Sequence, residues 1–188
     1  MRSIKKLIYL VILILVLTGI GTLVYFLENN KQPESISLND SLGELVDYDT
    51  FSTKVPNGWV LMEDPQNFLA VVIKPANASS TDYYTYYAVN NTSLEQKNLE
   101  EYVNALKDIL VADNSNIEFT DQYSKEINGK NSIYLELESE SLGQDYKTLL
   151  VFIADGDWVW VLSFNTPLNS WEEDKTTFDY ILQNFQIK

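Results

Sequence analysis

Two hydrophobic patterns divide the chain. Leu7 to Leu27 is an unbroken apolar run of 21 residues that carries no charge. At about 1.5 Å per residue, a helix of this length spans roughly 30 Å, the thickness of the hydrocarbon core of a bilayer. After residue 47, apolar positions alternate or recur every three to four residues instead. The first pattern predicts a transmembrane helix, and the second predicts a folded domain.

Short strands and one helix are expected in the first half of the domain. Apolar runs at 49–55, 68–74 and 82–89 have the length and composition of strands. Between the first two runs, Pro56-Asn57-Gly58 predicts a turn that returns Trp59 to the core. Asn98 and Glu101 form a capping box for a helix. Its apolar positions have helical spacing: Leu99, Tyr102, Val103, Leu106 and Leu110.

A four-stranded meander is expected after that helix. Residues 117–127 and 133–137 alternate apolar with polar, and Asn128-Gly129 separates them. A three-residue loop with Gly129 in the left-handed conformation would place Phe119 opposite Leu137 and Tyr123 opposite Ile133. The next two strands, 147–154 and 158–165, are apolar on both faces and are therefore expected at the centre of the sheet.

The elements together predict an α+β fold. A second helix is expected after Ser170, with Ser170 as its cap and Glu173 at the capping-box position. Two helices can cover the two apolar faces of the central strands. We therefore expect an α/β/α sandwich with a central antiparallel sheet flanked by helices, preceded by one N-terminal transmembrane helix.

The membrane segment sets the predicted topology. Arg2, Lys5 and Lys6 precede the apolar run, so the positive-inside rule places residues 1–6 in the cytoplasm. Residues 7–27 are the expected signal anchor, 28–46 a polar tether and 47–188 the extracytoplasmic domain of a single-pass protein of the cell membrane. Cleavage near Gly19-Ile20-Gly21 is the alternative, but the apolar run continues beyond those residues.

Charge narrows the classes of partner. Ten basic and all 27 acidic side chains follow residue 27, which gives this part a net charge of −17. Such a chain repels nucleic acid and anionic lipid, so we expect no nucleic-acid partner. A protein partner or a cell-envelope component is the expected ligand, and membrane contact is expected only through the N-terminal helix.

Missing residue types restrict the chemistry. The sequence has no histidine and no cysteine, which excludes a Ser-His-Asp triad, a thiol nucleophile and the usual zinc sites. A carboxylate-dependent hydrolase stays open as an alternative because two acidic side chains can act as acid and base. We expect no enzyme activity and no cofactor. The other alternative is a calcium or manganese module, for which Glu136, Glu138 and Glu140 would form an oxygen ladder along one strand face.

Two features are candidates for partner binding. Four tyrosines lie within five positions, Tyr83, Tyr84, Tyr86 and Tyr87, and one pair could present a stacking surface to a sugar or a protein. Asp121 is predicted to share a strand face with Phe119 and Tyr123, where a buried carboxylate would be costly. A partner contact would explain Asp121, and so would a face that reaches water at the edge of the sheet.

The order of these features resembles the PsbP-like family. The matching stretches are FSTKVPNGW at 51–59, LEEYV at 99–103, INGKNSIYL at 127–135 and the final WVWVLSF with FDYILQNFQ. They cover roughly residues 47–187, and their order and spacing are more specific than any single stretch. Founding members of the family are extrinsic subunits of photosystem II, and many bacterial and archaeal members are exported and membrane-anchored.

The resemblance implies an antiparallel α/β/α fold and a non-enzymatic accessory role. Photosynthetic members help to retain calcium and chloride at a manganese cluster. A histidine-based metal site of those members has no counterpart here, because this chain contains no histidine. Our leading hypothesis from sequence is a membrane-anchored PsbP-like module that binds a protein or an envelope component.

Overall fold

A computed structural model describes residues 43–63, 65, 67–75, 85–113, 116–141 and 143–188. The segment predicted to cross the membrane, 7–27, lies outside these residues. Among the helices that are described, none is both long and apolar enough to span a bilayer.

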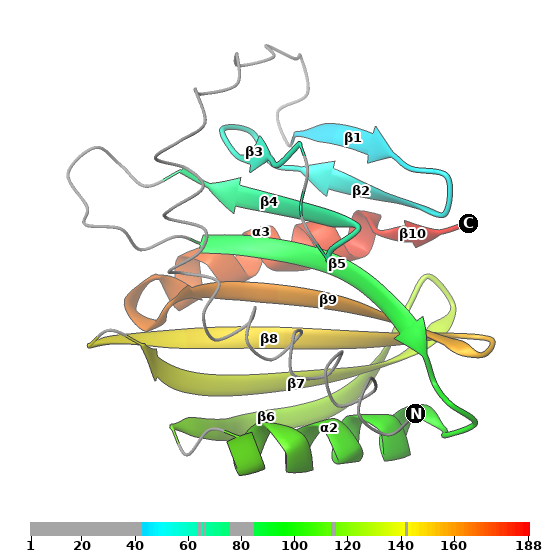
Figure 1. The fold of residues 1–188 in the computed structure, drawn as a ribbon. Coiled ribbons are helices and arrows are strands. Elements are labelled where there is room, and N and C mark those ends of the chain that lie inside the picture. The colour runs from blue at the N-terminus through cyan, green and yellow to red at the C-terminus, as the bar shows by residue number, and fades with distance from the viewer. Residues whose placement is uncertain (1–42, 64, 66, 76–84, 114–115, 142) are drawn as a thin grey trace.

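One large antiparallel sheet organises the described fold (Figure 1). Its seven strands stand in the order β3-β4-β5-β9-β8-β7-β6. A small sheet has the order β1-β2-β10. The strands of the large sheet are β3 (Val60–Leu61), β4 (Ala70–Lys74), β5 (Thr85–Ser93), β6 (Ile117–Ile127), β7 (Lys130–Ser141), β8 (Gln144–Asp155) and β9 (Trp158–Pro167). Those of the small sheet are β1 (Glu44–Asp47), β2 (Phe51–Val55) and β10 (Gln186–Ile187).

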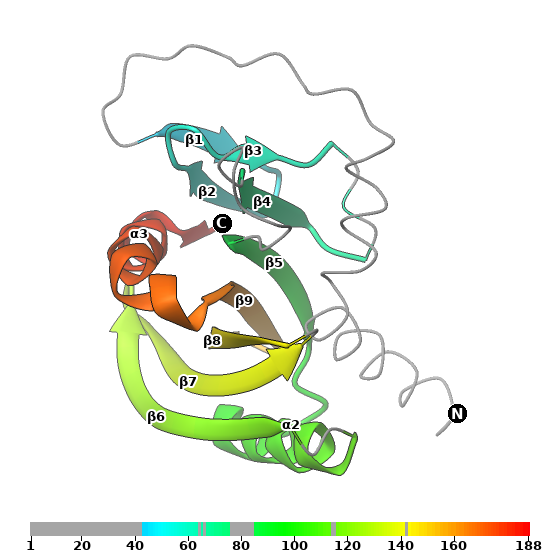
Figure 2. The same ribbon diagram turned by 90° about the vertical axis from the view of Figure 1, so that its left-hand side faces the viewer.

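Two helices cover opposite faces of the large sheet. Figure 2 shows the sheet curving around α3 (Trp171–Asn184), while α2 (Leu99–Asp113) lies on the outer face. The small sheet lies on the α3 side, where Phe51 joins Trp160 and Phe185 in one core. A second core lies under α2 and includes Val103, Leu135 and Phe152. The predicted mixed α+β fold with an antiparallel sheet and two helices is confirmed.

The central position of the doubly apolar strands is also confirmed. β9 and β8 are the fourth and fifth strands of the seven. Val151 and Leu162 face the α3 core, whereas Phe152 and Val161 face the α2 core. Burial on both faces explains why both strands are apolar at nearly every position.

Helix starts follow the sequence in one case and not in the other. At α2, Asn98 Oδ1 accepts the Glu101 N–H at 2.9 Å and Glu101 Oε2 accepts the Asn98 N–H at 3.0 Å, which confirms the capping box. The predicted box at α3 is wrong. A 3₁₀ turn, Leu168–Ser170, leads into α3, so Ser170 has helical backbone angles and makes no capping hydrogen bond. A cap residue normally has extended backbone angles that bring its side chain back to the first turn.

The predicted loop between β6 and β7 is wrong as well. Ile127 pairs directly with Lys130, so the loop has two residues, Asn128 and Gly129, both with positive φ as in a type I′ turn. Phe119 still pairs with Leu137, because a β-bulge between Phe119 and Asp121 shifts the register. Tyr123 pairs with Tyr134 rather than with Ile133.

The PNGW corner, residues 56–59, behaves as predicted. The Trp59 N–H donates to Pro56 O at 3.0 Å, and Gly58 takes a φ of 80°. Trp59 is partly buried and meets the Phe178 ring edge-on at 6.4 Å between centroids. The chain before it departs from the predicted boundary, since residues 44–46 of the predicted tether pair with β2.

Two glycines with positive φ predict a matched pair of stability effects. At Gly43 (φ 109°) an added Cβ would lie 2.2 Å from Val55 O, whereas at Gly58 (φ 80°) it would meet nothing within 4 Å. We expect Gly43→Ala to destabilise the full chain by about 2–3 kcal/mol and Gly58→Ala by about 1 kcal/mol. Urea unfolding measures both values, and equal effects would contradict the close approach of β1 to β2.

Candidate functional site

A row of polar side chains crosses the sheet beneath the first turns of α3. Lys74 pairs with Thr85 across β4 and β5, and Thr85 Oγ1 lies 2.8 Å from Thr166 Oγ1 on β9. The strand register extends this row to the edge of the sheet: Thr166 pairs with Lys147 on β8, Lys147 with Glu138 on β7, and Glu138 with Glu118 on β6. The polar row comprises Lys74, Thr85, Thr166, Lys147, Glu138 and Glu118.

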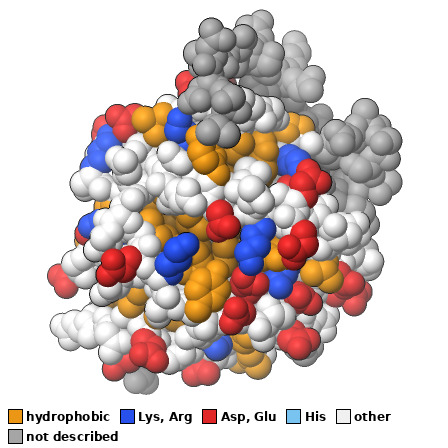
Figure 3. All heavy atoms as spheres, turned by 180° about the vertical axis from the view of Figure 1, so that it is seen from behind, with side chains coloured by type: hydrophobic (Ala, Val, Ile, Leu, Met, Phe, Trp, Pro, Cys, Tyr) orange, Lys and Arg blue, Asp and Glu red, His pale blue; other side chains and the backbone are white. Residues whose placement is uncertain are grey.

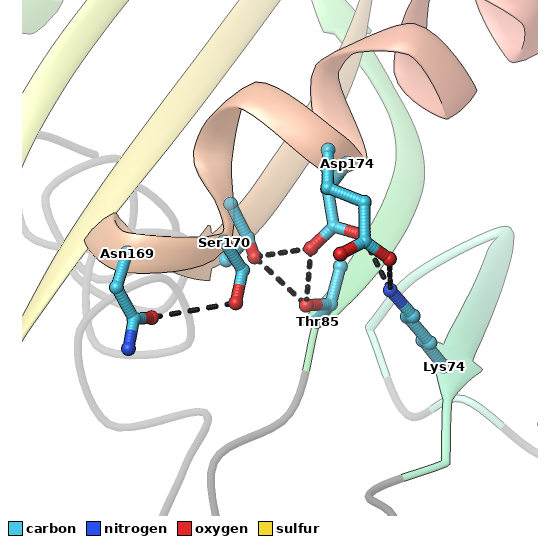
Figure 4. A network of polar contacts seen from close by, with 7 residues as sticks. Lys74, Thr85, Asn169, Ser170 and Asp174 are labelled. Atoms are coloured by element: carbon cyan, nitrogen blue, oxygen red, sulfur yellow. Dashed lines mark hydrogen bonds and ion pairs between the residues drawn. The ribbon is translucent and has the colours of Figure 1, made fainter.

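Asp174 on α3 binds one end of this row (Figure 4). Its carboxylate is 1% exposed and accepts Lys74 Nζ at 2.7 Å, Thr85 Oγ1 at 2.9 Å and Thr166 Oγ1 at 2.6 Å. Burial alone would lower the pKa of Lys74, but hydrogen bonds and charge from Asp174 and Glu173 outweigh it and raise that pKa. Asp174 is therefore a satisfied structural carboxylate, and sequence reasoning had not singled it out.

Glu136 forms a second buried ion cluster next to the row. It is 5% exposed and lies 3.1 Å from Lys147 Nζ and 3.4 Å from Lys175 Nζ. Both ammonium groups also lie over the Trp171 ring, at 5.0 and 5.3 Å from its centroid. Two lysines therefore pair with the carboxylate of Glu136, which the calcium hypothesis would use as a metal ligand. In the part of the chain that is described, no group of three or more acidic side chains is placed to hold a metal ion.

The tyrosine cluster does not form an exposed platform where it is described. Tyr86 is 8% exposed and Tyr87 is fully buried. Tyr87 donates to Lys54 O at 2.6 Å and so ties the two sheets together, and burial raises its pKa. Tyr83 and Tyr84 lie outside the described residues. Binding at this strand stays a prediction, but its described tyrosines offer no stacking surface.

Asp121 is exposed on β6, the strand at the edge of the large sheet. The bulge between Phe119 and Asp121 separates their faces, so Asp121 lies with Tyr123 on the α3 side and Phe119 lies with Leu137 on the α2 side. The predicted face shared with Phe119 is wrong, and the face shared with Tyr123 is correct. Because Asp121 is exposed, its carboxylate is not buried there. Burial, followed by the charges of Glu136, Asp179 and Asp121, raises the pKa of Tyr123.

A cleft lies between the β6–β7 turn, the end of β8 and β10. Figure 1 shows these elements at the same end of the fold. We call this cleft the hairpin-end cleft. Two polar contacts hold its walls: Asn128 Nδ2 donates to Phe185 O at 2.6 Å, and Lys130 Nζ lies 2.6 Å from Asp155 Oδ1. Its volume is about 320 Å³, and it is lined by Ile127, Asn128, Lys130, Ile153, Phe185, Gln186 and Ile187.

Trp158 is the exposed aromatic at this end. It pairs with Asp155 across the β8–β9 turn, on the same face of the sheet as Lys130 and Ile153. Its side chain is 52% exposed, while Trp160, two residues along, is buried against Phe51 and Phe185. Sequence reasoning placed Trp158 in the core because it continues an apolar strand. The sequence does place Trp158 directly after a two-residue turn, and that position could have indicated that the buried part of the strand does not extend to it.

Three of the solved structures with a similar fold come from bacteria. Cyanobacterial PsbP (CyanoP) from Synechocystis sp. PCC 6803 aligns at a TM-score of 0.58 and 13% identity, over 83% of this chain and 98% of its own. LpqN, involved in cell envelope biogenesis of Mycobacterium tuberculosis, aligns at 0.60 and 9%, over 77% and 90%. PA94 of Pseudomonas aeruginosa, a protein of unknown function and putative regulator, aligns at 0.55 and 13%, over 78% and 98%.

The comparisons define the class of fold. No protein-family model and no curated protein matches the sequence. The structural neighbours show that the described domain has a PsbP-like fold, as the order of its sequence features predicted. At identities of 9–13%, that likeness extends to the fold alone.

Two glutamates on β7 test whether the acidic ladder is structural. Glu136 is buried between two lysines, whereas Glu138 is more exposed and lies 3.5 Å from Lys147. We expect Glu136→Gln to destabilise the chain by about 2 kcal/mol, because two lysines lose their buried counter-charge, and Glu138→Gln by less than about 0.5 kcal/mol. Chemical unfolding measures both, and the reverse order would contradict the structural role of Glu136.

Proposed function

We propose that this chain is a membrane-anchored, extracytoplasmic accessory module that binds a protein partner at the hairpin-end cleft. The exposure of Trp158 beside that cleft carries the proposal. Tryptophan is among the residues that most often dominate the energy of protein interfaces, especially next to a pocket that an apolar side chain can fill. PsbP-like and envelope-related structural neighbours are consistent with an accessory module.

The cleft has the composition of a small interface. Ile127, Ile153 and Phe185 supply apolar walls, and the Lys130–Asp155 pair supplies a charged rim. A partner segment that covers Trp158 would bury apolar area at the centre and keep the ion pair at the edge, the usual anatomy of a protein interface.

Membrane attachment is the second part of the proposal. The apolar run 7–27, with basic residues before it and a net charge of −17 after it, supports an anchor with the domain outside the cytoplasm. The 15 residues 28–42 can then act as a polar tether that lets the described domain reach a partner near the membrane.

A binding role agrees better with the interior of the fold than a catalytic role. Histidine and cysteine are missing from the whole sequence. The two most deeply buried acidic side chains among the described residues, Glu136 and Asp174, are neutralised by lysines. Neither is left to act as a general acid or base in a cleft. These same pairs give no support to the hydrolase or the divalent-cation alternative.

Photo-crosslinking tests the proposed site. A benzoylphenylalanine at position 158 of the full chain, in native membranes, is expected to give one discrete protein adduct. The same group at Val111, which is 55% exposed on α2, is the matched control. Purified wild-type chain should compete the adduct away, and a Trp158→Ala chain should not, because truncation of an interface tryptophan removes much of the binding energy.

Two results would overturn the site. One is the same adduct from positions 158 and 111, and the other is equal competition by the wild-type and Trp158→Ala chains. Because Trp158 is half exposed, we expect its replacement to change the free energy of unfolding by less than about 1 kcal/mol, so a folded competitor is available.

A further inference from the structure

β6 leaves a long edge of the large sheet open. It is the last strand in the order, and every residue from 120 to 126 is exposed, whichever face its side chain takes. The other outer strand, β3, has only two residues. An exposed edge of this length presents unpaired N–H and C=O groups that another strand can use.

The register shows which backbone groups point outward. The Gln122 N–H donates to the Asp121 side chain, Oδ1, at 2.8 Å rather than to β7. Residues of an antiparallel pair alternate between bonding inward and pointing outward. The N–H and C=O groups of Ser124 and Glu126 therefore share the outward direction with those of Gln122. Ser124 and Glu126 offer a short row of backbone donors and acceptors, whereas the Gln122 N–H is already bonded to Asp121.

An aromatic ring and two acidic side chains lie beside this edge. Tyr123 is 36% exposed and stacks on Tyr134, with ring centroids 4.9 Å apart. Asp121 and Asp179 are exposed, and neither has an ion pair within the described residues. A hollow of about 140 Å³ lies between β6 and α3, lined in part by Lys125, Tyr134, Asp179 and Gln183.

The charges favour a basic ligand. Around Tyr123, Asp121 on β6 and Asp179 on α3 outnumber Lys125 on β6. Figure 3, which views the α3 side, shows acidic and basic side chains around an exposed hydrophobic patch. An ammonium or guanidinium group over the face of Tyr123 would gain a cation–π contact and the attraction of the two unpaired carboxylates.

We propose that the edge of β6 between Asp121 and Ile127 binds an extended, lysine- or arginine-bearing protein segment as an additional strand. Backbone groups of Ser124 and Glu126 would hold the segment, and its alternate side chains would lie over Tyr123 and beside Asp121 and Asp179. The bulge after Phe119 limits pairing on the other side, because a bulge disrupts the ladder. This surface is separate from the hairpin-end cleft and does not depend on it.

Peptide binding to the full chain tests the proposal. The probe is a fluorescent peptide that alternates lysine and valine over about ten residues, the upper end of the usual strand length. A peptide of the same charge that alternates lysine and proline cannot pair with Ser124 and Glu126 while its lysines lie on the Tyr123 face, because its prolines, which lack the N–H, would then face β6. In fluorescence anisotropy we expect the valine peptide to bind about tenfold more tightly than the proline peptide.

Variants of β6 separate pairing from charge. Ser124→Pro removes an outward N–H without breaking a bond to β7, so the affinity for the valine peptide should fall about tenfold. The Ser124→Thr chain should bind this peptide like wild type. Asp121→Asn with Asp179→Asn should weaken binding about threefold or more and reduce its salt dependence. Circular dichroism checks that each variant is folded.

Some outcomes would overturn the edge site. Equal binding of the two peptides would show attraction by charge alone, and unchanged binding to a folded Ser124→Pro chain would place the peptide elsewhere. Trp158→Ala should bind the peptide like wild type. If that variant instead lost the peptide, the ligand would lie at the hairpin-end cleft and the edge site would be rejected.

Discussion

The ion pair between Asp174 and Lys74 fixes α3 in the curved face of the sheet. A buried carboxylate is costly unless it is paired and hydrogen-bonded, and Asp174 finds Lys74, Thr85 and Thr166 in one register row across three strands. Its neighbour Lys175 reaches Glu136 in the opposite direction along the sheet. Two adjacent residues of one helix therefore select a single docking position, which sets Phe178, Ile181 and Leu182 in the core.

This use of the buried charges is the reason why we place the proposed binding sites on the surface. The buried carboxylates stabilise the position of α3 by pairing with lysines, so these carboxylates are not free to bind a ligand. In the described domain, the two proposed binding sites lie where strands end or lack a neighbouring strand. The hairpin-end cleft lies between the β6–β7 turn, the end of β8 and β10, and the edge of β6 lies where the sheet stops. Both use exposed aromatic residues, Trp158 and Tyr123, and neither needs a histidine or a cysteine.

Sequence patterns predicted the parts of this fold that depend on local periodicity. The capping box at Asn98 and the central position of β8 and β9 follow from residues close in sequence. Features that depend on distant partners were missed. The bulge after Phe119 moves Asp121 to the other face, and a pattern of alternate residues cannot reveal one inserted residue. The buried ion pairs of Glu136 and Asp174 were missed, because the lysines come from other elements. Trp158 reads as core, because only the turn beside it reveals its exposure.

A double-mutant cycle on Lys74 and Asp174 tests most directly whether the buried charges are structural. Lys74→Met, Asp174→Asn and the double variant of the full chain would be unfolded in urea, and the coupling free energy taken from the cycle. We expect a coupling of about 2 kcal/mol, below the value for a fully buried pair because Lys74 is 36% exposed, and a double variant no less stable than Lys74→Met. A coupling near zero, with both single variants as stable as wild type, would contradict the role of this pair in holding α3.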